Sequence, residues 1–198
     1  DMLYRLGWVL FRLFFAVCYR WEVEGKEHIP DQGPLVVCPN HIHNLDPPLV
    51  GAAMNRKVHF MAKEELFRIP VLAQVIRRLG AFPVRRGASD RNAFKKAMQI
   101  LQEGKVLAIF PEGTRSRSGR LGKAHPGAAL IALKGNANVV PAAIIGPYRL
   151  FGKIRIVFGP PFRLDCPPGS KINSELLREQ SARIMEKIEA LLREGQNR

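Results

Sequence analysis

Two kinds of hydrophobic pattern alternate along the chain. Short, nearly continuous apolar runs have the length of buried strands, and longer stretches repeat apolar residues every three or four positions, as helices do. The strand-like runs are 22–25, 35–38, 58–61, 81–84, 106–110, 139–145 and 154–158. The helix-like stretches are 47–54, 70–79, 90–103, 126–134 and 174–193. This alternation predicts an α/β domain whose mixed, largely parallel sheet is flanked by helices.

Polar residues mark where two of these helices begin. Asp46 stands in capping position before Pro47, which suits the first turn of a helix. Ser89 or Asp90 is expected to cap the 90–103 helix, which ends at Gly104.

The first 21 residues differ from the rest of the chain. Residues 2–21 form an apolar and aromatic run that is interrupted by Arg5, Arg12 and Arg20, which fall within about 80° of one another on a helix. This pattern predicts an amphipathic helix in a membrane interface, its arginines toward the headgroups and its aromatic rings at the water–lipid boundary. A core helix and a membrane-spanning helix are the alternatives, and Arg12 makes spanning costly. We therefore expect residues 1–21 to be an N-terminal membrane-interface helix and residues 22–198 a single domain.

The charge balance predicts an anionic partner. Lys and Arg number 31 against 17 Asp and Glu, so the net charge is +14. Such a surface suits an anionic membrane or nucleic acid, or it has no partner at all. The chain has no nucleic-acid-binding motif, so we expect no nucleic acid. The three cysteines are far apart and indicate a reducing setting. The expected location is the cytoplasmic face of the cell membrane, as a peripheral or monotopic protein.

The segment 41–46 holds the best candidate for catalysis. A histidine oriented by a carboxylate can take a proton from an alcohol near neutral pH, and His41 is followed by Asp46 five positions later. An ideal helix would place these side chains about 140° apart, so they meet only if the chain bends between them. Asn44 and Pro47 permit such a bend, and His43 is a spacer.

Cations follow three of the predicted strands. Lys63 follows the run 58–61, a pair of arginines at 85 and 86 follows 81–84, and Arg115 and Arg117 follow 106–110. Groups at the carboxyl ends of parallel strands meet at one sheet edge, so one cleft could gather segments 40–46, 63–66, 85–87 and 111–117. Arginine forks match phosphate oxygens, which favours an anion site over a solvated basic loop.

Three residues near Arg115 complete the predicted anion site. Gly113 allows backbone N–H groups to approach a ligand, and Thr114 adds a hydroxyl. Glu112 could orient an arginine, accept from a substrate hydroxyl, or form a surface ion pair of little energetic value.

Two other chemistries fit less well. A closed metal site at His41, His43 and Asp46 would need further ligands, and the remaining histidines are not clustered, so we expect no metal and no cofactor. Cys38 could be a thiol nucleophile, but its apolar neighbours favour a buried thiol in a strand.

Four ordered blocks resemble those of the glycerolipid acyltransferases. The blocks are Asn40-His41-x4-Asp46, then Gly80 to Arg86, Phe110 to Arg115, and Val139-Val140-Pro141, with Ala62 to Leu66 between the first two. The pattern is most similar to the bacterial 1-acylglycerol-3-phosphate acyltransferases.

The resemblance implies an activity and the residues that carry it. A fatty acyl group would pass from an acyl thioester, acyl-ACP or acyl-CoA, to the sn-2 hydroxyl of lysophosphatidic acid, giving phosphatidic acid. His41 would be the general base and Asp46 its orienting partner, within an acyltransferase domain of residues 22–198. The expected substrate-binding residues are Lys63, Arg85, Arg86, Glu112, Gly113, Thr114 and Arg115. Arg85 stands where the family often has an acidic residue.

Two alternatives remain open from the sequence. The segment 115–120 has features of glycerol-3-phosphate acyltransferases, although Pro111 and Thr114 favour a lysophospholipid acceptor. A non-catalytic basic module that binds membranes is the other alternative.

Overall fold

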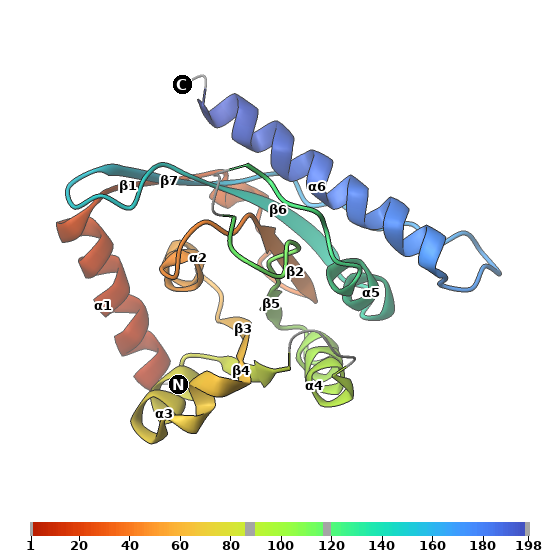
Figure 1. Cartoon of the computed structure of the whole chain (residues 1–198), viewed down its shortest axis with the longest axis horizontal. Coiled ribbons are helices and arrows are strands. Elements are labelled where there is room, and N and C mark those ends of the chain that lie inside the picture. The colour runs from red at the N-terminus through yellow and green to blue at the C-terminus, as the bar shows by residue number, and fades with distance from the viewer. Residues whose placement is uncertain (1, 86–89, 117–119, 197–198) are drawn as a thin grey trace.

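A seven-stranded sheet forms the centre of the molecule (Figure 1). The computed structural model describes residues 2–85, 90–116 and 120–196. The strands are β1 (Arg20–Glu24), β2 (Leu35–Pro39), β3 (Val58–Lys63), β4 (Ala81–Val84), β5 (Val106–Ala108), β6 (Asn138–Ile145) and β7 (Lys153–Phe158). Their order across the sheet is β1-β7-β6-β2-β5-β3-β4. Strands β6, β2, β5, β3 and β4 are parallel, β7 is antiparallel to β6, and β1 is parallel to β7, so the predicted mixed, largely parallel sheet is confirmed.

Helices cover both faces of this sheet. They are α1 (Met2–Cys18), α2 (Asp46–Ala53), α3 (Pro70–Arg78), α4 (Arg91–Gln102), α5 (Gly127–Lys134) and α6 (Ser174–Gln196), with 3-10 turns η1 (Lys26–His28) and η2 (Glu64–Arg68). Helices α1 and α2 lie on one face and α4, α5 and α6 on the other, while α3 lies beside β4 and the start of α1 (Figure 1). The helix at 90–103 is capped by Asp90, whose carboxylate accepts from the N–H groups of Asn92 and Ala93.

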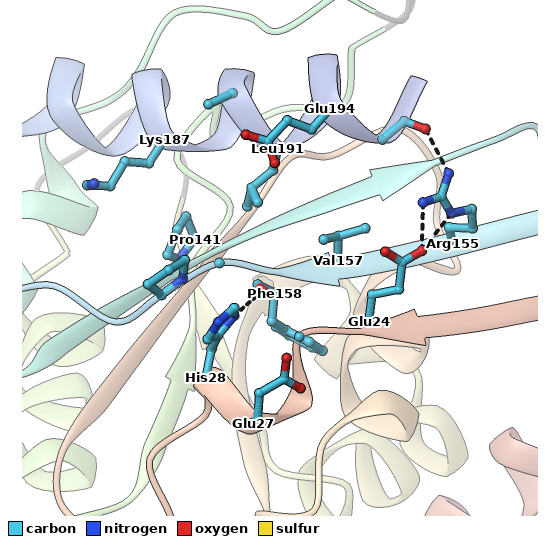
Figure 2. Close-up of a pocket in the computed structure, with 15 residues that line it drawn as sticks. Glu24, Glu27, His28, Pro141, Arg155, Val157, Phe158, Lys187, Leu191 and Glu194 are labelled. Atoms are coloured by element: carbon cyan, nitrogen blue, oxygen red, sulfur yellow. Dashed lines mark hydrogen bonds and ion pairs between the residues drawn. The ribbon is translucent and has the colours of Figure 1, made fainter. Parts of the chain in front are cut away.

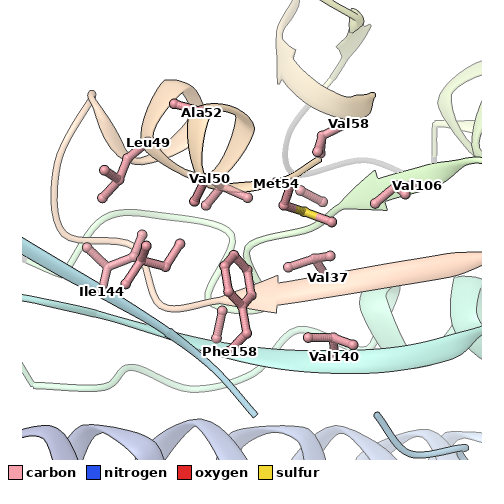
Figure 3. Packing of buried hydrophobic residues seen from close by; sticks show 14 of the residues in the cluster. Val37, Leu49, Val50, Ala52, Met54, Val58, Val106, Val140, Ile144 and Phe158 are labelled. Atoms are coloured by element: carbon pink, nitrogen blue, oxygen red, sulfur yellow. The ribbon is translucent and has the colours of Figure 1, made fainter. Parts of the chain in front are cut away.

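Both faces of the central strands are apolar, which explains why their sequences are continuous hydrophobic runs. Along β2, Leu35 and Val37 face the layer of α1 and α2, whereas Val36 and Cys38 face the opposite layer, and all four are fully buried. Figure 3 shows Val37 packed in the first layer among side chains of α2, β6 and β7. Full burial of a side chain of this size contributes roughly 1.5–3 kcal/mol.

Two expected element boundaries are wrong. Strand β5 ends at Ala108 rather than Phe110, because the chain turns away there and the Phe110 ring stacks on His41. The first helix ends at Cys18, and Trp21 belongs to strand β1.

The orientation of α1 differs from the expected one. The Arg12 guanidinium donates to the carbonyl of Ala52 at 3.1 Å and lies over the Trp8 ring. The predicted outward orientation is therefore wrong for Arg12, which turns inward to a carbonyl at the carboxyl end of α2, where a cation is favourable, whereas Arg5 and Arg20 are exposed. Both tryptophans also face inward: Trp8 donates to the Met54 carbonyl at 2.9 Å, and Trp21 packs against the fully buried Phe15.

The outer side of α1 is apolar. The exposed side chains there are Met2, Leu3, Leu6, Val9, Leu10, Leu13, Phe14 and Val17. Among the described residues, no helix has both the length and the apolar run needed to cross a bilayer.

The turn between β1 and η1 requires glycine, which gives a stability prediction. Gly25 has φ +72°, and a Cβ there would overlap the carbonyl oxygen of Phe158 in β7. We expect Gly25→Ala to lower the free energy of unfolding, measured in urea, by more than the roughly 1–2 kcal/mol of left-handed strain alone.

Gly33→Ala is the matched control for that substitution. Gly33 has φ +81°, but a Cβ there would meet nothing within 4 Å. It therefore reports the backbone strain without the collision, and an equal loss of stability in both variants would contradict the predicted steric clash.

Candidate active site

The sheet order brings the predicted segments together. Strands β2, β5, β3 and β4 are parallel neighbours, so the segments after their carboxyl ends lie at one edge of the sheet. These segments are 40–46 after β2, 111–116 after β5, 63–66 at the end of β3, and Arg85 after β4. Arg86, Gly87 and Arg117 lie outside the described residues.

A tight turn joins His41 to Asp46. The His41 Nδ1 atom lies 2.7 Å from Asp46 Oδ2, and the backbone N–H groups of Ile42 and His43 donate to the same oxygen at 2.6 and 2.7 Å. The predicted bend is therefore confirmed. The expectation that Asp46 caps α2 is wrong: Asp46 is the first residue of the helix after Leu45, and its carboxylate turns back toward His41 instead.

This geometry determines which His41 nitrogen can act as a base. Because Asp46 Oδ2 accepts from two backbone N–H groups, it is an acceptor toward the ring as well, so Nδ1 carries the hydrogen and Nε2 accepts. The ring is 8% exposed and stacks on Phe110, with the ring centroids 4.2 Å apart. His41 is thus held in one orientation with its basic nitrogen left free of Asp46.

Tyr148 is a site residue that the sequence reasoning missed. Its hydroxyl donates to the second oxygen of Asp46 at 2.6 Å, and its ring stacks on His43 at 4.4 Å between centroids. Burial, with the nearby Asp46 charge, raises the pKa of Tyr148, which keeps it a donor. Tyr148 and Asp46 are 102 positions apart in the sequence. The sequence contains only a weak indication of this contact, a tyrosine in a Gly-Pro turn after β6, at the same sheet edge.

Glu112 supports His41 from the opposite side. Its side chain is buried, with Oε1 accepting from the His41 N–H at 2.9 Å and Oε2 from the Gly122 N–H at 2.7 Å. The alternative of a surface ion pair is therefore wrong. Gly113 follows with φ +64°, and a Cβ there would press on the ring of His125. The next turn returns to the histidine, since the Ser116 N–H donates to the His41 carbonyl at 2.8 Å.

Exposed cations lie around this edge. Lys63 ends β3, Arg85 follows β4, and Arg115 stands beside Ser116 in the turn that contacts His41; all three are exposed, as is Thr114. Over the described ranges, the side chains of Lys63 and Arg115 form no hydrogen bond or ion pair. Cations without a protein partner can bind a phosphate group. Substrate binding by these residues and by Gly113 stays a prediction.

The backbone donors nearest His41 are already used. The N–H groups of His41, Ile42 and His43 donate to the two buried carboxylates. The first turn of α2 adds little, because Pro47 and Pro48 have no N–H. These three N–H groups are therefore not free to donate to a ligand.

Asn40 has a structural role that the block pattern does not reveal. Its side chain donates to the Ile144 carbonyl at 3.0 Å and accepts from the Ile144 N–H at 2.6 Å. This pair joins the end of β2 to β6 directly before the catalytic turn.

The alternative chemistries find no support at this site. Burial raises the pKa of the Cys38 thiol to about 12, so the thiol is protonated and the expected buried strand thiol is confirmed. Within the described ranges, no group of three or more His, Cys, Asp or Glu residues is placed to hold a metal ion.

Two pockets are relevant to ligand binding. An apolar pocket of about 300 Å³ lies between α1, α2, β3 and α3, and it reaches Asn44 and Pro47 beside the catalytic turn. Another, of about 570 Å³, lies between η1, β7 and α6 and contains none of the predicted site residues (Figure 2). Its Arg155 is already bonded to Glu24 and to the Gly195 carbonyl, so this larger pocket is not the candidate site.

Comparison with known proteins identifies the family. The family model described as Acyltransferase matches residues 20–145, more than half of the chain. The 1-acyl-sn-glycerol-3-phosphate acyltransferase of Bacillus subtilis is 34% identical over 71% of this chain and 72% of the relative. The enzyme of that name from Streptococcus pneumoniae is 31% identical over 89% and 70%.

Longer relatives and a solved structure agree with this result. A chloroplastic 1-acyl-sn-glycerol-3-phosphate acyltransferase of Arabidopsis thaliana is 29% identical over 86% of this chain, which spans only 50% of that relative. The crystal structure of the 1-acyl-sn-glycerophosphate acyltransferase from Thermotoga maritima has a TM-score of 0.69 and 26% identity, covering 96% of this chain and 78% of that one. These matches show that the chain belongs to the acyltransferase family.

Proposed function

We propose that this protein transfers a fatty acyl group from an acyl thioester to the sn-2 hydroxyl of lysophosphatidic acid, forming phosphatidic acid. The observation that carries this proposal is the buried His41–Asp46 pair, 2.7 Å apart, at the same sheet edge as Lys63 and Arg115, whose side chains have no partner among the residues that the structure describes. Relatives named as 1-acyl-sn-glycerol-3-phosphate acyltransferases support this choice of acceptor. The donor is acyl-ACP or acyl-CoA, both of which are anionic and suit the basic surface.

His41 acts as the general base in this mechanism. Nε2 takes the proton of the acceptor hydroxyl as that oxygen attacks the thioester carbonyl, forming a C–O bond. The tetrahedral intermediate then collapses, the C–S bond breaks, and the imidazolium returns its proton to the leaving thiolate. Asp46 stabilises the transient imidazolium and holds the tautomer, and neither a metal nor a covalent acyl-enzyme is needed.

The cations orient the acceptor. Arg115 is carried by the turn whose Ser116 N–H binds the His41 carbonyl, so a phosphate held there brings the acceptor hydroxyl toward His41. Lys63 and Arg85 reach the same edge from β3 and β4, and Arg86 is assigned from its block in the sequence. Glu112 fixes the backbone of His41 and the turn that carries Gly113 and Thr114.

The apolar pocket suits the acyl chain. It is lined by side chains of α1, α2, β3 and α3, including Trp8, Phe11, Phe60 and Leu79, and it opens beside Asn44 in the catalytic turn. An acyl chain in this pocket would place its thioester end next to His41. Because the pocket is walled by α1, the helix we assign to the membrane interface also borders the substrate site. This arrangement suits a monotopic enzyme on the cytoplasmic face of an anionic membrane.

Removal of the base should abolish turnover. We expect His41→Ala to lower kcat by about 10²- to 10⁴-fold, the usual contribution of general-base catalysis. The assay combines the purified protein with acyl-CoA or acyl-ACP and with lysophosphatidic acid or glycerol-3-phosphate. His28→Ala is the control, because His28 contacts the Phe158 carbonyl away from the site. Undiminished turnover in His41→Ala would contradict the mechanism. Faster turnover of the parent protein with glycerol-3-phosphate than with lysophosphatidic acid would contradict the proposed acceptor.

Tyr148 should act through Asp46, as a positioning residue. We expect Tyr148→Phe to lower kcat by about tenfold with KM unchanged, since only one charge-assisted hydrogen bond is lost. Asp46→Asn should cost far more, because an amide cannot accept from all four donors.

A double-substitution cycle separates this role from a structural one. In the Asp46→Asn background, Tyr148→Phe should cause little further loss of kcat, because residues of one hydrogen-bond network are not additive. Fully additive losses would show that Tyr148 acts independently of Asp46.

Loss of Arg115 should weaken acceptor binding. We expect Arg115→Ala to raise KM for lysophosphatidic acid by about tenfold or more, the loss of a charge-assisted pair. Arg178→Ala removes an exposed arginine from α6, on the other face of the sheet, and should leave KM unchanged. An unaltered KM in Arg115→Ala would place the phosphate clamp elsewhere.

A further inference from the structure

The exposed large apolar side chains are confined to one region of the molecule. Among the described residues they lie on α1, on η2 and α3, and at the tip of the β6–β7 turn. Beyond α1 they are Leu66, Ile69, Val71, Val75, Leu150 and Phe151. Contiguous apolar surface of this kind marks a contact with a membrane or another protein.

The outer faces of α1 and α3 are continuous. A groove of about 520 Å³ is lined by Leu6, Leu10 and Phe14 of α1 and by Val71 and Val75 of α3. Gly7 permits the close approach, since a Cβ there would overlap the Leu79 side chain at the end of α3. The two helices therefore present one apolar surface.

The β6–β7 turn extends this surface at the other end of α1. The Phe151 N–H donates to the Cys18 carbonyl at 2.7 Å, and the Arg20 N–H donates to the Gly152 carbonyl at 2.9 Å, so the turn abuts the end of α1 (Figure 1). Phe151 has φ +60°, a strained conformation for a residue other than glycine, and its side chain is 67% exposed. Strain of this kind persists only where the surrounding structure imposes it, and such positions cluster at functional sites. Here the two backbone hydrogen bonds hold the turn in place while the Phe151 side chain faces outward.

The charges favour an anionic lipid surface as the occupant. Helices α1 and α3 and the segment 146–152 contain no acidic residue. Exposed arginines border the apolar surface, namely Arg5, Arg20, Arg68, Arg77, Arg78 and Arg149. Apolar side chains ringed by cations suit insertion among anionic headgroups. A second copy of this chain would bring the same cations together, which is unfavourable.

We propose that the outer faces of α1 and α3 and the Leu150-Phe151 tip of the β6–β7 turn form one surface that binds an anionic lipid membrane. The proposal extends the function proposed above, in which α1 alone is assigned to the membrane. The turn follows the carboxyl end of β6, at the same sheet edge as His41, and it also carries Tyr148, which bonds Asp46. Insertion of the turn therefore sets the catalytic edge of the sheet against the lipid surface.

Vesicle sedimentation with the full chain tests this surface. The vesicles contain phosphatidylcholine and phosphatidylglycerol in equal parts, without acyl donor or acceptor. We expect Leu150→Ser combined with Phe151→Asn to weaken partitioning by about tenfold or more, because two large apolar side chains are lost. Asn tolerates the left-handed conformation at position 151, and an unchanged melting temperature verifies the fold. Val71→Ser combined with Val75→Ser should weaken partitioning similarly.

The binding assay separates the membrane-surface proposal from the acyltransferase proposal. Ala190→Ser changes an exposed residue of α6, on the opposite face, and should partition like the parent protein. Parent-like partitioning of both double variants would overturn the extended surface. A parent protein that is dimeric without lipid, together with double variants that are monomeric, would also overturn it, because the surface would then bind a second copy of this chain. Because no substrate is present, His41→Ala should bind vesicles normally. An inactive parent protein that partitions through α3 and the turn would refute the acyltransferase proposal while supporting this surface.

Discussion

Four hydrogen bonds converge on the carboxylate of Asp46, and the geometry of the site depends on them. The carboxylate is fully buried, and an isolated buried charge would be strongly unfavourable. Two backbone N–H groups of the turn, the His41 ring and the Tyr148 hydroxyl satisfy it together. Together these bonds join three parts of the chain: the turn after β2, which supplies three of the donors, the start of α2, where Asp46 lies, and the turn after β6, which supplies Tyr148. One buried carboxylate therefore holds His41 and its surroundings in a fixed arrangement.

A second buried carboxylate, that of Glu112, holds the backbone of His41. Glu112 binds the backbone N–H of His41 while Asp46 binds its ring, so the residue is fixed at two points. Phe110, two positions before Glu112, stacks on the ring and limits its remaining freedom. Both negative side chains inside the site bond to groups of the turns around His41, and within the described ranges the side chains of Lys63 and Arg115 at the same sheet edge form no ion pair.

Helix α1 connects the apolar outer surface of the molecule to the pocket near His41. Helix α1 turns Trp8 and Arg12 toward the end of α2, which leaves an outer side made mostly of aliphatic side chains. The pocket beside the catalytic turn lies under this helix, between it and α3. The apolar outer side of α1, the apolar pocket and the turn from His41 to Asp46 are thus adjacent, as the proposed function on a lipid layer requires.

Hydrophobic periodicity determined much of this fold in advance. Continuous apolar runs predict buried strands, and they predicted the mixed parallel sheet whose neighbouring strand ends gather the segments around His41 and Asp46. The tertiary structure alone decided that Tyr148 reaches Asp46, that Asn40 bridges to Ile144, and that Arg12 faces inward. These contacts join residues distant in sequence, so no local pattern encodes them. The amphipathic pattern of α1 is compatible with either orientation, and only its packing partner, α2, decides which face is buried.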